Sequence, residues 1–263
     1  MEQKQRGKIF YFEPSLAGDG VAAGFTTRHE GVSRSPYNSL NLGLSTNDSP
    51  HSVQGNRSLL ARAFGRELDH LLTVTQVHGD DILVIDEEND DLSHFQKVEC
   101  DGIVTNQRGI MIGVTIADCV PIILHDPRRR VVAALHAGWK GTALGIAAKG
   151  VETMVSLFGS KPSDIHGAIG PAIGPCCYEV DQPVRDAFAG RESLWSLFAT
   201  PSAPGKWMID LKGINRHILL SSGVSPSHLE SSPHCVACAP ETFFSYRRDN
   251  GETGRQIGFV MLV

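Results

Sequence analysis

Six short apolar runs crowd into the central part of this sequence, and they constrain the fold more than any other feature. Each run has four to six residues rich in valine and isoleucine, and turn residues separate it from the next run. We predict strands over 71–76, 81–85, 102–105, 111–116, 120–124 and 130–135. Several of these runs have too few polar residues to lie half exposed, so they predict a sheet covered on both faces.

Strands and helices mix without strict alternation in the rest of the chain. Further strands are predicted over 8–12, 21–27, 165–169 and 257–263. Helices are predicted from Pro50, over 141–158, from about Asp181 and over 210–221. The pattern favours an α/β (α+β) fold, a mixed-sheet sandwich rather than a doubly wound one. No linker or repeat interrupts it, so we expect residues 1–263 to form a single domain.

The composition is that of an ordinary globular protein, with 263 residues, 41% hydrophobic and 20% charged. A net charge of −5 argues against nucleic acid as a partner, because binding to phosphates needs a basic surface. No apolar segment follows the basic residues at the N-terminus, and the longest apolar runs are too short to span a bilayer. We therefore expect a cytoplasmic protein with no membrane partner. We also expect it to be a monomer or homodimer.

Six cysteines occur, at 100, 119, 176, 177, 235 and 238. In a chain of this length without a signal peptide, they predict reduced thiols, metal ligands or a nucleophile rather than a disulfide framework. Cys235 and Cys238 form a CxxC motif, but no second CxxC exists. We interpret these two as plain thiols, and Cys176 and Cys177 as structural residues in a pocket wall.

Three residues stand out by position as well as by type. His78 follows a predicted strand, Cys119 lies between two strands, and His136 ends a strand before a helix. Side chains at strand ends meet in a common crevice. Two imidazoles and one thiolate leave a tetrahedral zinc ion with one vacant position, as catalytic sites require, and zinc makes bound water acidic.

The same atoms allow other hypotheses. Cys119 and His136 match the nucleophile and base of a cysteine hydrolase. Two histidines and one cysteine also suit copper in a trigonal site, although the absence of a His-x-His pair argues against an extended multicopper centre. Buried thiols and hydrogen-bonded core histidines are common, and no short motif such as HExxH joins the three residues.

Eight segments, in order along the chain, resemble the YfiH/LACC1 family, also called the multicopper polyphenol oxidase or laccase-domain family. They are GFTTRHEGVS, SLNLG, TQVHGD, DGIVTN, ADCVPI, HAGWKGT, AIGPAIGPCCYEV and FFSYRRD. The resemblance covers residues 10–263 and implies the α/β/β/α sandwich shared with the catalytic domain of cytotoxic necrotising factor. One departure is Glu30, where the family commonly has glycine, which puts the shape of that loop in doubt.

The resemblance implies a zinc enzyme that phosphorolyses adenosine, inosine and methylthioadenosine and deaminates adenosine. Purine nucleosides and phosphate are then the partners. The family's zinc ligands lie in the QVHG, ADC and HAGW motifs, which here give His78, Cys119 and His136 as metal ligands and catalytic residues. The older label of polyphenol oxidase keeps copper open as the metal.

Phosphorolysis requires an anion site. The loop 138–142 leads into a predicted helix, whose N-terminal amides attract phosphate. Arg28 and Arg247, which lie in the family motifs, are predicted to add bidentate contacts, and Arg248 is more typical of an ion pair.

A nucleoside also requires apolar and polar contacts. Phe244 is the predicted stacking residue, with Tyr178 and Trp139 as further candidates. Asn41 and Gln76 are predicted to bind base or ribose edges. Two acidic side chains, Asp101 and Asp118, are placed to orient a ligand histidine or to transfer a proton.

Three alternatives to the nucleoside enzyme remain open at this point. One is a copper oxidase acting on phenols. The second is a hydrolase or amidase with Cys119 as nucleophile, acting on a cell-wall precursor. The third is a metal-binding module without catalytic activity.

Overall fold

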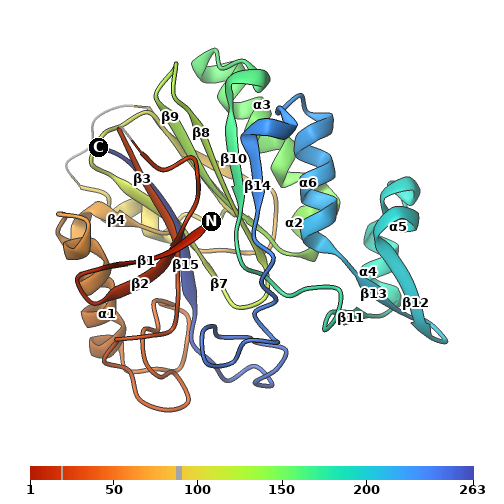
Figure 1. Ribbon diagram of the computed structural model, residues 1–263, viewed down its shortest axis with the longest axis horizontal. Coiled ribbons are helices and arrows are strands. Elements are labelled where there is room, and N and C mark those ends of the chain that lie inside the picture. Colours follow the sequence, from red (N-terminus) through yellow and green to blue (C-terminus); the bar gives the residue numbers. More distant parts are fainter. Residues whose placement is uncertain (19, 87–90) are drawn as a thin grey trace.

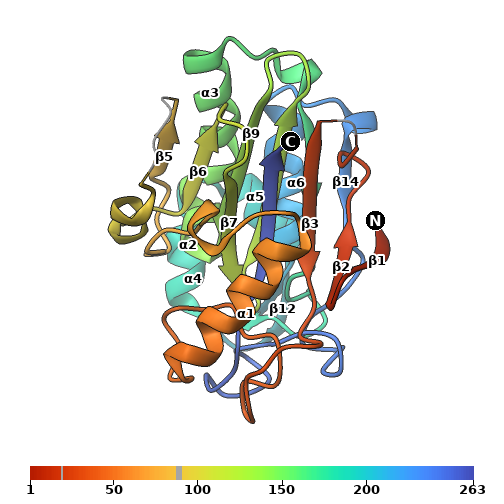
Figure 2. The same cartoon turned by 90° about the vertical axis from the view of Figure 1, so that its left-hand side faces the viewer.

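Two six-stranded sheets face each other, and helices cover the outer face of each (Figures 1 and 2). The computed structural model describes residues 1–18, 20–86 and 91–263. Helix α1 (Pro50–Ala63) lies on the first sheet, and α3 (Ile146–Phe158) and α6 (Leu211–Ser221) lie side by side on the second. The order of layers is α/β/β/α, which confirms the mixed-sheet sandwich predicted from the sequence.

The first sheet is antiparallel except for its last pair of strands, β7 and β4. In spatial order it contains β1 (Glu2–Arg6), β2 (Ile9–Glu13), β3 (Val21–Thr26), β15 (Gln256–Leu262), β7 (Met111–Ile116) and β4 (Leu71–Leu72). The last strand of the chain therefore lies in the middle of this sheet, as the apolar C-terminus requires.

The second sheet is mixed, with parallel pairs at both edges and antiparallel pairs between them. In spatial order it contains β14 (Leu229–Ser231), β10 (His166–Ile169), β8 (Val120–Asp126), β9 (Val131–Ala137), β6 (Gly102–Thr105) and β5 (Ile82–Ile85). Its centre is the β8–β9 hairpin, and every residue of these two strands is buried.

A smaller sheet extends from the second one, to the right in Figure 1. It and its helices comprise β11 (Glu179–Val180), β13 (Lys206–Ile209), β12 (Ala199–Ala203), α4 (Gln182–Ala187) and α5 (Glu192–Phe198). Short 3-10 helices complete the elements, at Leu68–His70, Ser93–Lys97, Pro162–Asp164 and Pro226–His228.

Three hydrophobic cores fill the spaces between the four layers, and the central strands contribute to two of them. Along β8, Ile122 and Leu124 face the core under α3 and α6, whereas Ile123 faces the core between the sheets. Successive strand residues point to opposite faces, so a strand between two cores needs apolar residues at every position. This explains why the central runs of the sequence do not alternate with polar residues.

The predicted strand 71–76 is wrong beyond its first two residues, because only Leu71–Leu72 pairs with β7 as β4. Further along β7, the side chain of Gln76 replaces strand pairing. Its Nε2 donates to the carbonyl of Thr115 at 2.9 Å, and its Oε1 accepts from the Thr115 amide at 2.8 Å. The side-chain amide satisfies the same backbone groups as a neighbouring strand would. The chain after Gln76 can therefore leave the sheet as a loop.

The predicted helix 141–158 is also wrong as a single element. The structure has two helices, α2 (Trp139–Leu144) and α3, separated at Gly145. Gly145 has φ 96°, and a Cβ there would lie 2.6 Å from the guanidinium of Arg191, which donates to the carbonyl of Leu144. The left-handed backbone favours glycine here, and it ends the first helix.

No helix in residues 1–18, 20–86 and 91–263 has the length and apolar character needed to span a bilayer. The longest helix described there, α1, has 14 residues, whereas a span requires about 20 apolar residues.

Candidate metal and substrate site

The structure brings His78, Cys119 and His136 together. Their possible ligand atoms all lie within 4.8 Å of one another, and the two imidazole rings are 4.9 Å apart at 79°. His136 lies on β9, Cys119 in the turn between β7 and β8, and His78 in the loop after β4. The β8–β9 register pairs Pro121 with His136, so hairpin pairing alone places the thiol beside that imidazole.

A fully buried carboxylate, Asp101, holds two of the three residues in place. Its Oδ1 accepts from Nδ1 of His136 at 2.7 Å and from the His78 amide at 3.0 Å. Its Oδ2 accepts from the amides of Val77 and Gly79, at 3.2 Å and 2.6 Å. The bond to Nδ1 leaves Nε2 of His136 for the centre of the site, as a carboxylate beside a metal-binding histidine typically does.

The backbone is strained beside two of the three residues. His78 has φ 62° and Asp118, the neighbour of Cys119, has φ 97°, a region that side chains other than glycine rarely adopt. The bonds from Asp101 stabilise the first conformation. Asp118 is held by the Ser245 hydroxyl and the Arg247 amide, both 2.6 Å from its carboxylate. Such strain persists only where surrounding contacts enforce it, and it is typical of functional sites.

The thiol and the imidazoles act on one another electrostatically. Burial alone would raise the pKa of Cys119, but the positive charge and hydrogen bonds of His136 and His78 lower it to about 6. Burial would lower the pKa of His136, but the Cys119 charge and the bond to Asp101 raise it. Without metal, the pair therefore favours thiolate and imidazolium at neutral pH.

Gly138 leaves the space in which the three side chains meet. A Cβ at this position would lie 3.0 Å from Cδ2 of His78, 3.3 Å from Sγ of Cys119 and 3.8 Å from Cε1 of His136. A methyl group at this position would crowd His78 and Cys119, while its distance to His136 is an ordinary contact, so glycine leaves room for the three side chains to meet.

The three residues open into a cavity of about 480 Å³ between the sheets' loops, within the range of small-molecule sites. Polar, aromatic and cationic side chains share its wall. Besides the three candidate ligands, the lining includes Ser45, Gln76, Thr115, Ile116, Ala117, Asp118, Trp139, Tyr178, Tyr246, Arg247 and Arg255.

Two of the predicted substrate-binding residues, Gln76 and Arg247, line this cavity. The amide of Gln76 is already engaged by Thr115. Arg247 lies over the ring of Tyr178 at 5.0 Å and donates to the carbonyl of Glu179 at 2.7 Å. These contacts fix its guanidinium at the cavity wall.

The structure does not bring Arg28, Asn41 or Phe244 to the cavity lining. Arg28 lies over the buried ring of Phe244 and donates to the carbonyls of Asn38 and Pro240, at 2.8 Å each. Asn41 is fully buried, and it donates to Thr46 and Asp48 and accepts from the amides of Gly43 and Arg255. Their polar groups are used in shaping the loops behind the cavity, which the family motifs alone did not reveal.

Six residues of the lining were not predicted from the sequence: Arg255, Tyr246, Ser45, Thr115, Ile116 and Ala117. Of these, Arg255 and Tyr246 bring a charge and an aromatic ring. Arg255 lies over the Tyr246 ring at 5.5 Å and donates through Nη1 to the carbonyls of Thr253 and Gly254. Tyr246 stands in the FFSYRRD segment next to Arg247, which was a usable signal. Arg255 had none, because it lies outside the quoted segments and its backbone must turn into β15 to reach the site.

The donor set suits a borderline-soft metal. One thiolate and two imidazoles fit zinc, and they also fit copper. The hydrogen bond between Asp101 and His136 and the free space at Gly138 are what a metal held by these three residues would need.

Comparison with known proteins gives one consistent family. The sequence model described as "Multi-copper polyphenol oxidoreductase laccase" matches residues 22–263. "Purine nucleoside phosphorylase YlmD" of Geobacillus stearothermophilus is 40% identical, over 98% of this chain and 96% of that protein. The protein of the same name from Bacillus subtilis is 36% identical, over 91% and 88% of the two chains.

The fold comparison agrees. The crystal structure of the Bacillus licheniformis hypothetical protein YfiH matches with a TM-score of 0.91 and 36% sequence identity. The match covers 97% of each chain, so it includes both large sheets and the helices on them.

Proposed function

This chain belongs to the multi-copper polyphenol oxidoreductase laccase family, and from that membership we propose that it is a purine nucleoside phosphorylase. The similar proteins of Geobacillus stearothermophilus and Bacillus subtilis carry that name. We assign catalysis and metal binding to His78, Cys119 and His136. Adenosine, inosine and methylthioadenosine are the proposed substrates, with deamination of adenosine as a second activity, because all share the purine ring.

One observation supports this proposal above the others. The wall of a single cavity carries both the three candidate metal ligands and two guanidinium groups, those of Arg247 and Arg255. Phosphorolysis needs an anion site beside the group that acts on the nucleoside, and guanidinium groups bind phosphate through paired hydrogen bonds.

The reaction sets the tasks of these residues. A phosphate oxygen forms a bond to C1′ of the ribose while the bond from C1′ to the purine nitrogen breaks. The electron pair leaves with the purine, which takes up a proton, and ribose 1-phosphate remains. Arg247 and Arg255 hold the phosphate, and the rings of Tyr178, Tyr246 and Trp139 offer apolar faces to the purine.

Zinc is the proposed metal, since three protein ligands with one free position are typical of catalytic zinc, and bound zinc would supply a Lewis acid. Asp101 orients His136, and Asp118 positions Arg247 by accepting a hydrogen bond from the backbone amide of Arg247. Burial raises the pKa of Asp118, but both its oxygens already accept hydrogen bonds, so we assign it to positioning rather than to proton transfer.

The test combines elemental analysis of the purified protein with chromatography of the products from adenosine plus phosphate. We expect zinc, adenine and ribose 1-phosphate, with adenine formation dependent on phosphate. Cys119→Ala should lose the metal of this site and lower turnover by at least about 100-fold. Cys100→Ser is the matched control, because Cys100 is a buried thiol outside the cavity.

Other results would contradict the proposal. Full turnover in a Cys119→Ala protein that lacks the metal of this site would exclude metal catalysis there. Stoichiometric copper with oxygen consumption on phenols would favour the oxidase. Inosine as the sole product would indicate deamination and exclude phosphorolysis.

A second candidate, a cysteine hydrolase, is favoured by one specific feature. Cys119, His136 and Asp101 stand in the order of nucleophile, base and orienting carboxylate. It predicts activity without metal and an acyl group trapped on Cys119. The place of His78 as a third donor favours the metal site, since a hydrolase does not need it.

A further inference from the structure

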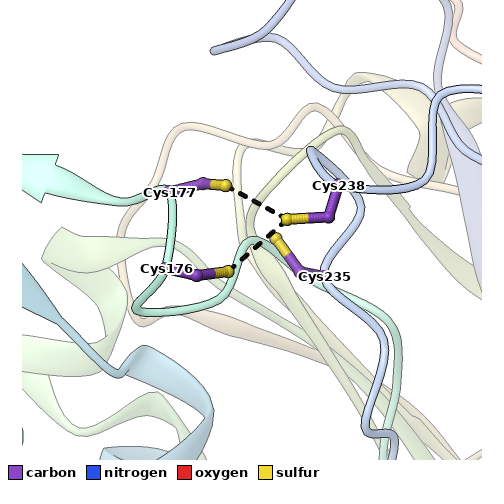
Figure 3. Close-up of side chains that lie close together, drawn as sticks. All are labelled: Cys176, Cys177, Cys235 and Cys238. Atoms are coloured by element: carbon purple, nitrogen blue, oxygen red, sulfur yellow. Dashed lines mark hydrogen bonds between the residues drawn. The ribbon is translucent and has the colours of Figure 1, made fainter.

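Four cysteines from two distant segments meet in a second cluster (Figure 3). Cys176 and Cys177 lie in the turn between β10 and β11, and Cys235 and Cys238 lie in the turn after β14. Their sulfur atoms all lie within 4.8 Å of one another. The interpretation of Cys235 and Cys238 as plain thiols rested on the lack of a second CxxC motif, whereas in the structure the adjacent pair Cys176 and Cys177 completes the set.

The distances do not define disulfide partners. Sγ of Cys238 is 3.3 Å from that of Cys177 and 3.6 Å from that of Cys176, far from the ~2.05 Å of a disulfide bond. One sulfur is thus shared between two neighbours. In a tetrahedron of sulfurs each ~2.3 Å from zinc, the edges would be roughly 3.8 Å, and the observed separations match this scale.

Main-chain hydrogen bonds join the two segments that carry the cysteines. The two segments pair at Ala172 and Cys235, and the Val236 amide donates to the Ala172 carbonyl at 3.1 Å. The Gly174 amide donates to Sγ of Cys235 at 3.2 Å, a bond that stabilises charge on sulfur. Main-chain bonds therefore hold the two segments side by side and fix the sulfur of Cys235.

A buried cation lies beside the cluster. The ammonium of Lys212 donates to the carbonyls of Ser232 and His234, at 2.9 Å each, on the segment that carries Cys235. Its charge acts on Cys176 and Cys235. Zinc with four thiolates carries two net negative charges, and a nearby ammonium offsets part of them.

We propose that Cys176, Cys177, Cys235 and Cys238 bind one zinc ion as four thiolates, in a closed structural site separate from the His78–Cys119–His136 site. Four sulfur ligands leave no position for substrate. Binding releases the thiol protons to solvent, so it couples metal affinity to pH and to folding.

The site would brace the cavity wall. Cys177 directly precedes Tyr178, which lines the cavity, and Arg247 bonds to the carbonyl of Glu179. On the other segment, Arg248 donates from Nη1 to the carbonyl of Val236, within the CxxC turn. Zinc would thus fix the two loops that carry Tyr178 and Arg247. Only this consequence rests on the proposed function.

The zinc content of purified variants tests the proposal. We expect two zinc ions per chain in the unaltered protein, one in Cys119→Ala, one in the double variant Cys235→Ser with Cys238→Ser, and two in the control Cys100→Ser. One zinc in both the unaltered protein and the double variant would overturn the inference. Bound iron or a mass lowered by disulfide formation would also overturn it. Loss of turnover without a change in this pattern would contradict only the proposed function.

A double variant that fails to fold would leave the ligands untested, so a second measurement uses Cys119→Ala. X-ray absorption at the zinc edge should show its remaining zinc surrounded by sulfur alone. A shell containing nitrogen or oxygen would refute the four-thiolate site.

Discussion

The two clusters of candidate metal ligands both contain thiols, but they differ in their surroundings. The first combines one thiol with two imidazoles, rests on the buried carboxylate of Asp101 and opens into the cavity. The second has four thiols, rests on backbone amides and joins two turns. The residues with left-handed backbone are His78, in the first cluster, and Asp118, next to Cys119 of that cluster.

The first cluster has the features of a catalytic site, and the second has those of a structural site. A vacant ligand position, a supporting carboxylate and backbone strain are typical of functional sites, and they do not stabilise the fold. A closed set of thiolates between two loops stabilises the fold and leaves no room for substrate. Four substitutions or measurements sharpen this contrast, from the largest expected effect to the smallest.

Asp101→Asn should lower turnover of adenosine by 10- to 100-fold, the usual effect of removing a carboxylate behind a metal-binding histidine. The amide keeps the size of the side chain but loses the charge that holds His136 in its tautomer. Steady-state kinetics and zinc content provide the measurement. Zinc in the four-cysteine cluster should not change, and an equal loss from both clusters would show general unfolding instead.

Gly138→Ala should weaken metal binding at the open site, on the order of tenfold, because its methyl group would crowd the side chains of His78 and Cys119. Competition with a chromophoric zinc chelator measures the affinity. Gly190→Ala is the matched control, since a Cβ at Gly190 meets nothing within 4 Å. Equal affinity in the two variants would contradict the crowding argument.

Alkylation of the chelator-treated protein should distinguish the thiols by their dependence on pH. With a pKa of about 6, Cys119 is already thiolate at neutral pH, so its rate should stay flat from about pH 7 to 9. Burial and its thiol neighbours raise the pKa of Cys177. Its rate should therefore rise about tenfold per pH unit. Mass spectrometry of labelled peptides measures both, and parallel slopes would contradict the shifts.

Glu30→Gly should raise the free energy of unfolding by about 1 kcal/mol, because Glu30 has φ 64° where a side chain is disfavoured. Chemical denaturation measures this gain, and both clusters should keep their metal. Asn250→Gly, at φ 51°, should gain less, since asparagine adopts this conformation more readily than glutamate. An equal or negative effect at Glu30 would show that its side chain stabilises the loop.

Local pattern predicted most of the fold. The strands at 102–105 and 111–116 agree residue by residue with β6 and β7, because apolar runs between turns leave few alternatives. The two errors have different causes, one long-range and one local. Gln76 replaced a strand through its bonds to Thr115, which is distant in the chain, whereas the helix breaks at Gly145, whose left-handed backbone is a local feature.

For the candidate site, the sequence predicted the metal ligands but not the contacts of the surrounding side chains. Family motifs identified His78, Cys119 and His136, and the structure brings these three together. They did not reveal that the polar groups of Asn41 and Arg28 are engaged by the protein itself, nor that Arg255 reaches the cavity. A motif gives the residue type, whereas the contacts that engage a side chain come from elsewhere in the chain.

The sequence by itself determined the layered fold and the three donors of the open site, because hydrophobic pattern and residue type are local properties. Only the tertiary structure decided that an adjacent cysteine pair and a CxxC turn form one cluster, and that Asp101 rather than Asp118 is the carboxylate that orients His136. Metal binding and hydrogen bonding act over a few ångströms. Which groups come that close depends on sheet pairing between segments distant in the chain.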